Sequence, residues 1–424
     1  MNYKPRIVDA ILRDKLDAMG AVLIEGAKAC GKSTTGEQQA KSIIKIDEPD
    51  LLLQYRQLAQ TNISKLLAGA TPRLIDEWQI IPSLWDAVRH EVDKRSEDGQ
   101  FILTGSSVPA DRSEIQHSGA GRFAWLKMRP MSLWESGESS GEVSLKELFE
   151  SPEEISGTNT HTLDDIAYYV CRGGWPKSVN KKTQKASLMQ VFEYYNAIIQ
   201  SDLSRVDGVN RDKERAERIM RSYARLQGTQ ATLGVISEDV SPNEKMKVSS
   251  ETISSYLSAL RKIFIIEDMK AWNPNLKSRT AIRTSDTRYY VDSSIAVAAM
   301  GLGPSDLIND MKTFGLLFET LCIRDLRVFA DALTGEVYHY RDKNGLECDA
   351  VVHLRNGRYG LIEIKIGGDK NIDESAANLN KLASLIDIDR MRAPSFCMVL
   401  VGVGPYAYRR ADGVYVVPIG CLKD

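Results

Sequence analysis

A glycine-rich loop near the N-terminus constrains the fold of this chain more than any other stretch. It reads Gly-Ala-Lys-Ala-Cys-Gly-Lys-Ser (26–33) and follows a short apolar run, GAVLIE, that is typical of a buried strand. Glycines at this spacing let backbone N–H groups point at phosphate oxygens, and a following helix contributes the positive end of its dipole. The order strand–loop–helix therefore indicates a nucleoside triphosphate site, with a ligand-free glycine-rich turn as the alternative.

The residues of this loop have distinct expected roles. Lys32 would neutralise the β- and γ-phosphates, and the Ser33 hydroxyl would ligate magnesium. Contacts to ATP are expected from the whole loop, namely Gly26, Ala27, Lys28, Ala29, Cys30, Gly31, Lys32, Ser33 and Thr34.

Two further apolar runs end in residues suited to the same chemistry. RLIDE ends in Asp76, expected to complete the magnesium shell, and Glu77, expected to orient and deprotonate the attacking water. QFILTGSS ends in small polar residues, of which Ser106 is favoured as a γ-phosphate sensor and Thr104 is the substitute. Without the phosphate loop, both runs would be interpreted as strands that end in polar turns.

Arg122 follows Gly-Ala-Gly and is expected on an exposed turn. An arginine in that position could reach into a neighbouring subunit's nucleotide site and stabilise transition-state charge. The alternative is an ordinary surface arginine.

The phosphate loop, LIDEWQ, ILTGSS, GR…RPMSLWE and RGGWP resemble a prokaryotic family of AAA-type ATPases over nearly the whole chain. Members of this family join an AAA-type module to a C-terminal domain of unknown function. The resemblance implies a RecA-like αβα sandwich with a helical lid, ATP and Mg²⁺ as cofactors, and a homo-oligomeric ring, with a hexamer as the expected size. It also implies that Arg122 acts across the ring interface. RGGWP would begin a lid helix from which Arg172 approaches the γ-phosphate, with a simple Gly-Pro turn as the alternative.

An arginine-rich stretch in the middle of the chain indicates contact with a nucleic-acid backbone. Its arginines recur at helical spacing and fall within an arc of about 120°, which forms a single basic stripe. A solvated helix face is the alternative. The stripe consists of Arg211, Arg215, Arg218, Arg221 and Arg225.

The next segment resembles the last helix and the wing of a winged helix. Ser249 or Ser250 is the expected N-cap, and the expected buried stripe is Ile253, Tyr256, Leu257, Leu260 and Ile263. The outward face is small and polar, as a groove-entering helix requires. DNA contacts are expected from Ser254, Ser255 and Arg261, and from a wing that carries Lys277, Arg279 and Arg283. Winged helices also bind proteins, so a protein partner is the alternative.

The C-terminal third carries a second set of charged residues. A helix with Glu319 precedes three strand-like runs, EVYHYRD, LECDAVVHL and RYGLIEIKIG, whose connectors contain Asn-Gly. This layout resembles the PD-(D/E)xK nuclease core. The resemblance implies that Asp349 and Glu363 hold Mg²⁺ or Mn²⁺, that Lys365 positions or activates water, and that Glu319 assists. A scaffold kept only for binding is the alternative.

Side-chain parity makes this resemblance testable. A two-residue Asn-Gly loop would pair Asp349 with Ile364 and send Glu363 to the opposite face of the hairpin. A three-residue loop, Arg355–Gly357 with Gly357 in the left-handed region, would pair Asp349 with Glu363 directly. A shared site therefore requires the three-residue loop.

Bulk properties limit the cellular setting. No apolar run reaches the roughly 18–20 residues that span a bilayer, so no membrane contact is expected. The formal net charge of −2 excludes a uniformly basic nucleic-acid binder but permits a local basic patch. The cysteines are scattered singly, which favours reduced thiols in the cytoplasm over structural zinc.

Together these features predict an α/β protein that hydrolyses ATP and acts on branched or otherwise structured DNA, with a C-terminal domain that grips or cleaves it. Two alternatives remain: a nucleotide-controlled signalling or assembly switch with a protein-binding winged helix, and a nuclease gated by ATP. The expected segments are an AAA-type P-loop ATPase core (1–135), a linker and helical lid (136–228), a winged-helix domain (229–305) and a restriction-endonuclease-like α/β domain of the PD-(D/E)xK type (306–424).

Overall fold

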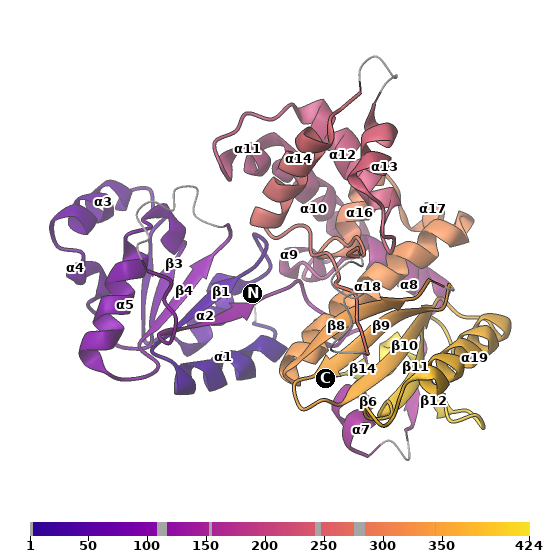
Figure 1. Cartoon of the computed structure of the whole chain (residues 1–424). Coiled ribbons are helices and arrows are strands. Elements are labelled where there is room, and N and C mark those ends of the chain that lie inside the picture. Colours follow the sequence, from indigo (N-terminus) through magenta and orange to yellow (C-terminus); the bar gives the residue numbers. More distant parts are fainter. Residues whose placement is uncertain (1–2, 108–116, 152–154, 242–246, 275–284, 344) are drawn as a thin grey trace. The chain divides into compact units, whose positions relative to one another are not determined.

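The computed structural model of the chain divides by its internal contacts into two compact units (Figure 1). It describes residues 3–107, 117–151, 155–241, 247–274, 285–343 and 345–424. The first unit comprises Met1–Pro130, Gln200–Arg211 and Leu257–Ile265, and the second comprises Met131–Ile199, Asp212–Tyr256 and Ile266–Asp424. The division into four domains stays a prediction, because each of these units combines several segments of the chain.

The first unit contains a five-stranded sheet in which all paired strands are parallel. Its strand order is β2-β3-β4-β1-β5. The strands are β1 (Ala21–Glu25), β2 (Ser42–Lys45), β3 (Arg73–Asp76), β4 (Phe101–Gly105) and β5 (Phe123–Lys127). The predicted α/β core with a parallel sheet is confirmed.

Helices cover both faces of this sheet, as parallel strands require. On one face, Leu23, Ile75 and Leu103 share a core with the apolar side chains of α5 (Leu84–Arg95). On the other face, Gly36 lies so close to β3 that a Cβ there would be 2.9 Å from a methyl group of Leu74. Other elements of this unit are α1 (Ile7–Ala18), α2 (Lys32–Gln39), α3 (Leu52–Thr61), α4 (Ser64–Leu67), the 3₁₀ turn η1 (Trp78–Ile80), α11 (Leu203–Arg205) and the last two turns of α14 (Ser250–Lys262).

The second unit contains a seven-stranded sheet in the order β7-β12-β13-β11-β10-β9-β8. Its strands are β7 (Gly157–Thr158), β8 (Gly335–Arg341), β9 (Glu347–Leu354), β10 (Tyr359–Lys365), β11 (Phe396–Val401), β12 (Tyr406–Arg409) and β13 (Tyr415–Pro418). Strands β8, β9 and β10 form an antiparallel meander, and β10 pairs in parallel with β11. The predicted three-stranded meander after a helix, α18 (Met311–Ala332), is confirmed.

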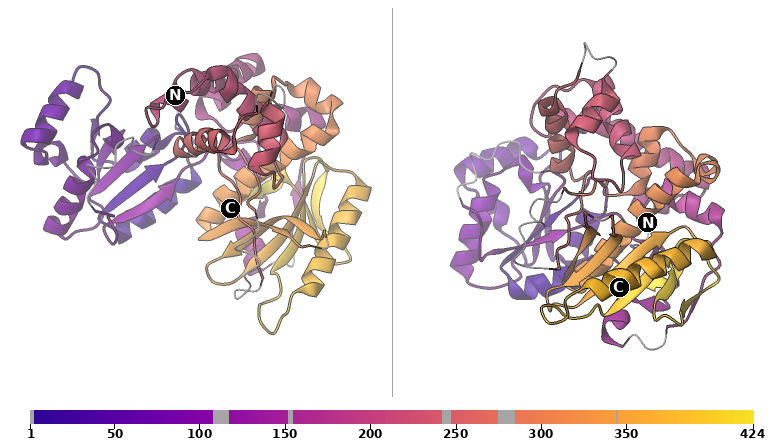
Figure 2. Two further views of the ribbon diagram at one scale, coloured as in Figure 1. Left: turned by 45° about the horizontal axis from the view of Figure 1, so that its top comes forward. Right: turned by 45° about the vertical axis from the view of Figure 1, so that its right-hand side comes forward.

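The connection from β10 to β11 is α19 (Asp369–Leu385), which lies across one face of this sheet (Figure 2). Its apolar side chains share a core with Val351, Leu361 and Val399. The segment after the middle helices also reaches this sheet, because Ala271 bridges His339 of β8 and the Trp272 backbone N–H donates to the His339 carbonyl at 2.6 Å.

Helices form most of the remaining structure. They are α6 (Leu133–Ser136), α7 (Leu145–Glu150), α8 (Leu163–Arg172), α9 (Pro176–Val179), α10 (Gln184–Ala197), α12 (Lys213–Arg225), α13 (Leu233–Val240), α14 (Ser250–Lys262), α16 (Ser293–Met300), α17 (Pro304–Asn309), the π-helical turn η2 (Ile198–Asp202) and the 3₁₀ turn η4 (Ile419–Cys421). A two-stranded parallel pair, β6 (Val143–Ser144) with β14 (Leu422–Lys423), joins the end of the chain to residues near α7.

Ser249 caps α14, since its hydroxyl accepts a hydrogen bond from the Thr252 N–H at 3.2 Å. The five predicted stripe residues are all buried, four of them within α14 and Ile263 directly after it. Two antiparallel bridges follow, Ile266 with Tyr290 and Met269 with Thr287.

A buried arginine organises the second unit. Arg324 of α18 has a side chain that is 1 % exposed, and its guanidinium lies 2.8 Å from Asp292 and 2.7 Å from Asp325. Asp325 also accepts a hydrogen bond from the Leu133 N–H at 2.8 Å, and Asp292 accepts one from the Gly174 N–H at 2.9 Å. One cation thus holds four segments of the chain together.

The RGGWP motif belongs to this arrangement and leads into a helix, although that helix begins at the last residue of the motif, and its role as a lid stays a prediction. Arg172 is the last residue of α8, and the following helix, α9, begins only at Pro176. The two glycines have a packing reason. A Cβ on Gly173 would lie 2.2 Å from an Asp292 carboxylate oxygen, and one on Gly174 would lie 2.0 Å from the Met131 carbonyl oxygen.

We expect Arg324→Met to lower the free energy of unfolding of the second unit by about 3–5 kcal/mol, because it leaves two carboxylates buried without a cation. Urea titration followed by tryptophan fluorescence and circular dichroism measures this loss. The control is Arg341→Met, which removes an ion pair whose side chains are 51 % and 47 % exposed and should cost less than about 1 kcal/mol. Equal losses in the two variants would contradict the role of Arg324.

Candidate functional site

The phosphate loop lies between the end of β1 and the start of α2, as its motif predicts. Its backbone depends on both glycines. Gly31 has a φ of 113°, in the region that favours glycine, and a Cβ on Gly26 would lie 2.1 Å from the Met128 carbonyl oxygen. Larger residues at either position would change the loop.

The Lys32 side chain lies against this loop. Lys32 is 5 % exposed, and its ammonium donates to the Gly26 and Ala27 carbonyl oxygens, each at 2.9 Å. The cation is therefore held next to the backbone that is expected to surround the phosphates.

A hydroxyl and a carboxylate meet at the same edge of the sheet. The Ser33 hydroxyl donates to Asp76 Oδ1 at 2.7 Å, and the Thr104 hydroxyl donates to the same oxygen. Because β1, β3 and β4 are parallel, their carboxyl ends coincide and bring these three residues together. Oxygen ligands from one or two side chains, with phosphates and water as the others, are the donor set that Mg²⁺ prefers. Ser33 and Asp76 therefore fit the predicted magnesium site.

Glu77, the predicted general base, is held by two donors. Its carboxylate accepts hydrogen bonds from the Ser106 hydroxyl at 2.9 Å and from the Gln79 amide. Its backbone has a φ of 56°, a left-handed conformation that non-glycine residues adopt at a cost and that clusters at functional sites. The sequence analysis did not identify Gln79 as a partner of Glu77. The only signal for it was its position two residues after Glu77.

Arg122 lies at the amino end of the strands of the same sheet, opposite the end that carries the phosphate loop. It directly precedes β5, and its carbonyl oxygen accepts a hydrogen bond from the N–H of Ala21, the first residue of β1. Five residues of strand, roughly 17 Å at 3.3 Å per residue, separate it from the phosphate loop. Its side chain is 43 % exposed and pairs with Asp93 at 2.7 Å. Arg122 is thus not part of its own nucleotide site, and its action on a neighbouring subunit stays a prediction.

Arg172 does not support the predicted contact with the γ-phosphate. It lies in the second unit, is 3 % exposed and pairs with Glu138 at 2.5 Å. Its guanidinium also donates to the Ser136 hydroxyl and stacks on the ring of Tyr169. Arg172 is a structural residue in this arrangement, because its polar groups are directed at the protein.

The hairpin of β9 and β10 has the three-residue loop that a shared site requires. The register pairs Ala350 with Ile362, so one further step places Asp349 opposite Glu363. The Leu354 N–H donates to the Arg358 carbonyl, and Gly357 has a φ of 82°. The predicted loop geometry is confirmed, and the two carboxylates share one face of the hairpin.

Lys365 lies between these carboxylates. Its ammonium is 3.0 Å from Asp349 Oδ2 and 2.9 Å from Glu363 Oε2. Burial lowers the pKa of Lys365, but the two carboxylates together have the larger effect and raise this pKa above its usual value. On the other side, the Asn378 amide donates to Glu363 Oε1 at 2.8 Å. Asn378 comes from α19, and no sequence signal identified it.

Glu319 is near this site but bonds elsewhere. Its carboxylate accepts a hydrogen bond from the Tyr289 hydroxyl. Burial, together with the charge of Asp349, raises the pKa of Glu319 to about 8, and the same two causes raise the pKa of Glu363 to about 7. Tyr289 was missed because it lies thirty residues before Glu319, on a run, RYYVD, that was interpreted as the strand after the wing.

The second site offers only two carboxylates, Asp349 and Glu363, as protein ligands to a metal ion. Within the described residues, no group of three or more His, Cys, Asp or Glu side chains is placed to hold a metal ion. A divalent ion here would be held by Asp349 and Glu363, with other oxygens from substrate and water, and would have to displace the Lys365 ammonium from its position.

The predicted arginine stripe is only partly formed. Arg211 precedes α12, is 7 % exposed and pairs with Asp207 through two nitrogens at 2.7 and 2.9 Å, so it cannot belong to an outward stripe. Arg218 and Arg221 are exposed on α12, Arg215 is half-buried, and the exposed Arg225 pairs with Asp239 at 3.2 Å.

The predicted outward residues of α14 are exposed, namely Ser254, Ser255 and Arg261. Lys277, Arg279 and Arg283 of the predicted wing lie outside the described residues. In the described part of the chain, no helix combines the length and the apolar character that a membrane span needs.

Family models match three consecutive stretches of the chain. Residues 19–136 match the family model of an AAA domain, which includes the phosphate loop, Asp76, Glu77 and Arg122. Residues 163–306 and 314–422 match two domains of unknown function, DUF8612 and DUF4143 respectively.

Two uncharacterized mycobacterial proteins are similar over nearly the whole chain. They are Mb2031c of Mycobacterium bovis (strain ATCC BAA-935 / AF2122/97) and Rv2008c of Mycobacterium tuberculosis (strain ATCC 25618 / H37Rv). Each is 22 % identical over 424 residues, which is 99 % of this chain and 84 % of the relative. The chain therefore carries an AAA domain, which indicates ATPase activity, followed by a C-terminal domain of a family whose function is unknown.

Proposed function

We propose that this protein is a magnesium-dependent ATPase that acts on DNA. The observation that carries the ATPase part is the convergence, at the carboxyl edge of one parallel sheet, of the phosphate loop with the ends of β3 and β4. That edge combines a lysine, a hydroxyl–carboxylate pair and a glutamate held by two donors. No other cluster of side chains described above offers this set to a nucleotide.

The roles follow from these contacts. Lys32 neutralises the β- and γ-phosphates, and Ser33 with Asp76 holds Mg²⁺, which supplies further charge neutralisation when bound. Glu77, oriented by Ser106 and Gln79, aligns the attacking water and accepts its proton. Arg122 completes the site of the next subunit in a homo-oligomeric ring, for which its exposure and its distance from its own phosphate loop are the support.

DNA contact is proposed through the middle helices. Arg218 and Arg221 present two exposed guanidinium groups on one side of α12, which suits a phosphate backbone. Ser254, Ser255 and Arg261 of α14 offer a small polar face, which suits a groove. Among these residues only Arg261 is suited to bidentate readout of a base, so structured rather than sequence-specific DNA is the proposed substrate.

Metal-dependent strand cleavage is the second proposed activity. It is favoured by one observation: the three-residue loop brings Asp349 opposite Glu363, with Lys365 between them. With a divalent ion on the two carboxylates, Lys365 would be released to a phosphate oxygen or to the attacking water. If no cleavage occurs, the same site serves to grip DNA.

Lys32→Ala is expected to abolish nucleotide binding, and Glu77→Gln to retain binding while slowing ATP turnover by orders of magnitude. Fluorescent-nucleotide binding and phosphate release measure the two effects. Mixing Arg122→Ala with Glu77→Gln subunits should restore part of the turnover, because some mixed interfaces contain both intact residues. Parent-like turnover in Glu77→Gln would remove Glu77 from the role of base.

The pair Arg218→Glu and Arg221→Glu should weaken DNA binding to a similar extent on all sequences and lower the salt slope by about two, since two phosphate contacts are lost. Fluorescence anisotropy across a salt series measures both. The matched control is the pair Arg56→Glu and Lys94→Glu, which reverses the charge of two exposed cations on helices of the AAA domain. Unchanged affinity in the α12 variant would favour a signalling role with a protein-binding middle segment.

Lys365→Met should increase the affinity for Mn²⁺ by roughly tenfold at pH about 8, because it removes a cation that competes for the same two carboxylates. Calorimetry without nucleotide, in an Asp76→Asn background, isolates this site. In the parent, where burial and Asp349 raise the pKa of Glu363 to about 7, affinity should rise as the pH increases through that value. In Lys365→Met the same rise should occur at a higher pH, because Lys365 lowers the pKa of Glu363.

The control for this variant is Lys370→Met, which removes a cation that is 88 % exposed on α19. Asp349→Asn should weaken Mn²⁺ binding in either background. If Lys365→Met binds Mn²⁺ less tightly than the parent, the two carboxylates are not a metal site.

A further inference from the structure

A cavity of about 540 Å³ opens beside Lys365 in the second unit. It lies between the first turns of α18 and the carboxyl end of β10, where the chain leaves the sheet for α19. Its volume falls within the range of about 300–1,000 Å³ that ligand sites occupy. None of the roles given above uses this space.

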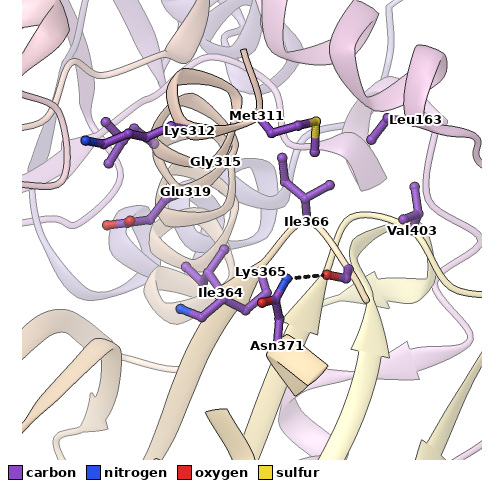
Figure 3. Close-up of a pocket in the computed structure, with 12 residues that line it drawn as sticks. Leu163, Met311, Lys312, Gly315, Glu319, Ile364, Lys365, Ile366, Asn371 and Val403 are labelled. Atoms are coloured by element: carbon purple, nitrogen blue, oxygen red, sulfur yellow. Dashed lines mark hydrogen bonds between the residues drawn. The ribbon is translucent and has the colours of Figure 1, made fainter. Parts of the chain in front are cut away.

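The cavity has two chemically different ends. Figure 3 shows Lys312 and Glu319 extending from α18 to one side. Met311, Ile366 and Val403 gather on the other side of the view and form an apolar wall. An apolar wall of this kind suits the flat face of an aromatic ring, whereas two nearby lysines suit negative groups attached to it.

The polar end is continuous with the carboxylate site. Lys365 lines the cavity and also lies within 3.0 Å of both Asp349 and Glu363. Glu319 lines the cavity as well, and together with Asp349 it also lines a second, smaller pocket. A ligand in the cavity therefore lies next to the position that Asp349, Glu363 and Lys365 surround.

We propose that the cavity receives one unstacked nucleobase of a DNA strand whose adjoining phosphate lies beside Lys365, next to the divalent ion that Asp349 and Glu363 would hold. This inference rests on the proposed action on DNA. The base packs on the apolar wall, and the ammonium groups of Lys312 and Lys365 lie toward the flanking phosphates.

The energy of unstacking gives this site a preference among DNA structures. Extruding a base costs a few kcal/mol in a paired duplex and least where the base is mismatched or already unpaired. A site that takes one unstacked base therefore selects bulges, forks and single strands without reading their sequence. This would account for a preference for structured DNA through the C-terminal domain itself.

Gly315 allows the cavity to be filled without disturbing the fold. It lies on α18 and lines the cavity, its φ is not in the left-handed region, and a Cβ there would meet no atom within 4 Å. Leucine at this position also has a higher helix propensity than glycine. Gly315→Leu should therefore fold normally and occupy the space of the base, and Gly315→Ala should have a smaller effect.

The probe is DNA that carries a single 2-aminopurine, whose fluorescence increases when it leaves a base stack. Oligonucleotides with this base in a bulge, at a fork or in a full duplex are titrated with the whole protein in the presence of Mn²⁺, with anisotropy of a second dye reporting binding. We expect a several-fold fluorescence increase with the bulge and the fork, and little with the duplex. Gly315→Leu should lose the increase and bind the bulge and the fork only about as tightly as the full duplex, while its affinity for the duplex stays that of the parent.

The control is Ala377→Leu, which adds the same apolar bulk at an exposed position of α19. Binding without a fluorescence increase in the parent, or an increase that persists in Gly315→Leu, would overturn the inference and leave the action on DNA intact. Absence of anisotropy change on every DNA would overturn the proposed function and the inference with it.

Discussion

The Arg324 guanidinium, held between two buried carboxylates, is the interaction on which the second unit depends. Buried charges are tolerated only when paired and hydrogen-bonded, so Asp292 and Asp325 must both stay in place. Each of them in turn accepts a backbone N–H from the RPMSLWE or RGGWP stretch. Because Arg324 and Glu319 belong to the same helix, this network also sets where α18 presents Glu319 to the carboxylate site.

The two candidate sites are assembled by different means. In the AAA domain, parallel strands end at one edge, so the strand pairing itself brings together residues that follow separate strands. In the C-terminal domain, the antiparallel register of β9 and β10 places Asp349 beside Glu363. One residue more or less in the loop between these strands would put the two carboxylates on opposite faces. Both sites hold a lysine beside the groups expected to bind a ligand, against carbonyl oxygens in the first and carboxylates in the second.

Cation burial distinguishes the predictions that the structure supports from those that it does not. Arg172 and Arg211 were assigned to nucleotide and DNA, yet each is almost fully buried and paired with an acid close in space. Arg218 and Arg221 lie in the same helical pattern and remain exposed. The periodicity of charges identifies a helix face, but it does not tell which members turn inward to a partner.

Local chemistry could be predicted because it depends on residues close together in the chain. The phosphate loop needs two glycines at a set spacing, and the β9–β10 hairpin needs a glycine at the left-handed position of a three-residue loop. By contrast, Asn378 reaches Glu363 from α19, and Tyr289 reaches Glu319 from thirty residues away. The sequence alone thus determined which residues have the chemistry, whereas packing between distant segments decided which of them meet, because no local pattern encodes those contacts.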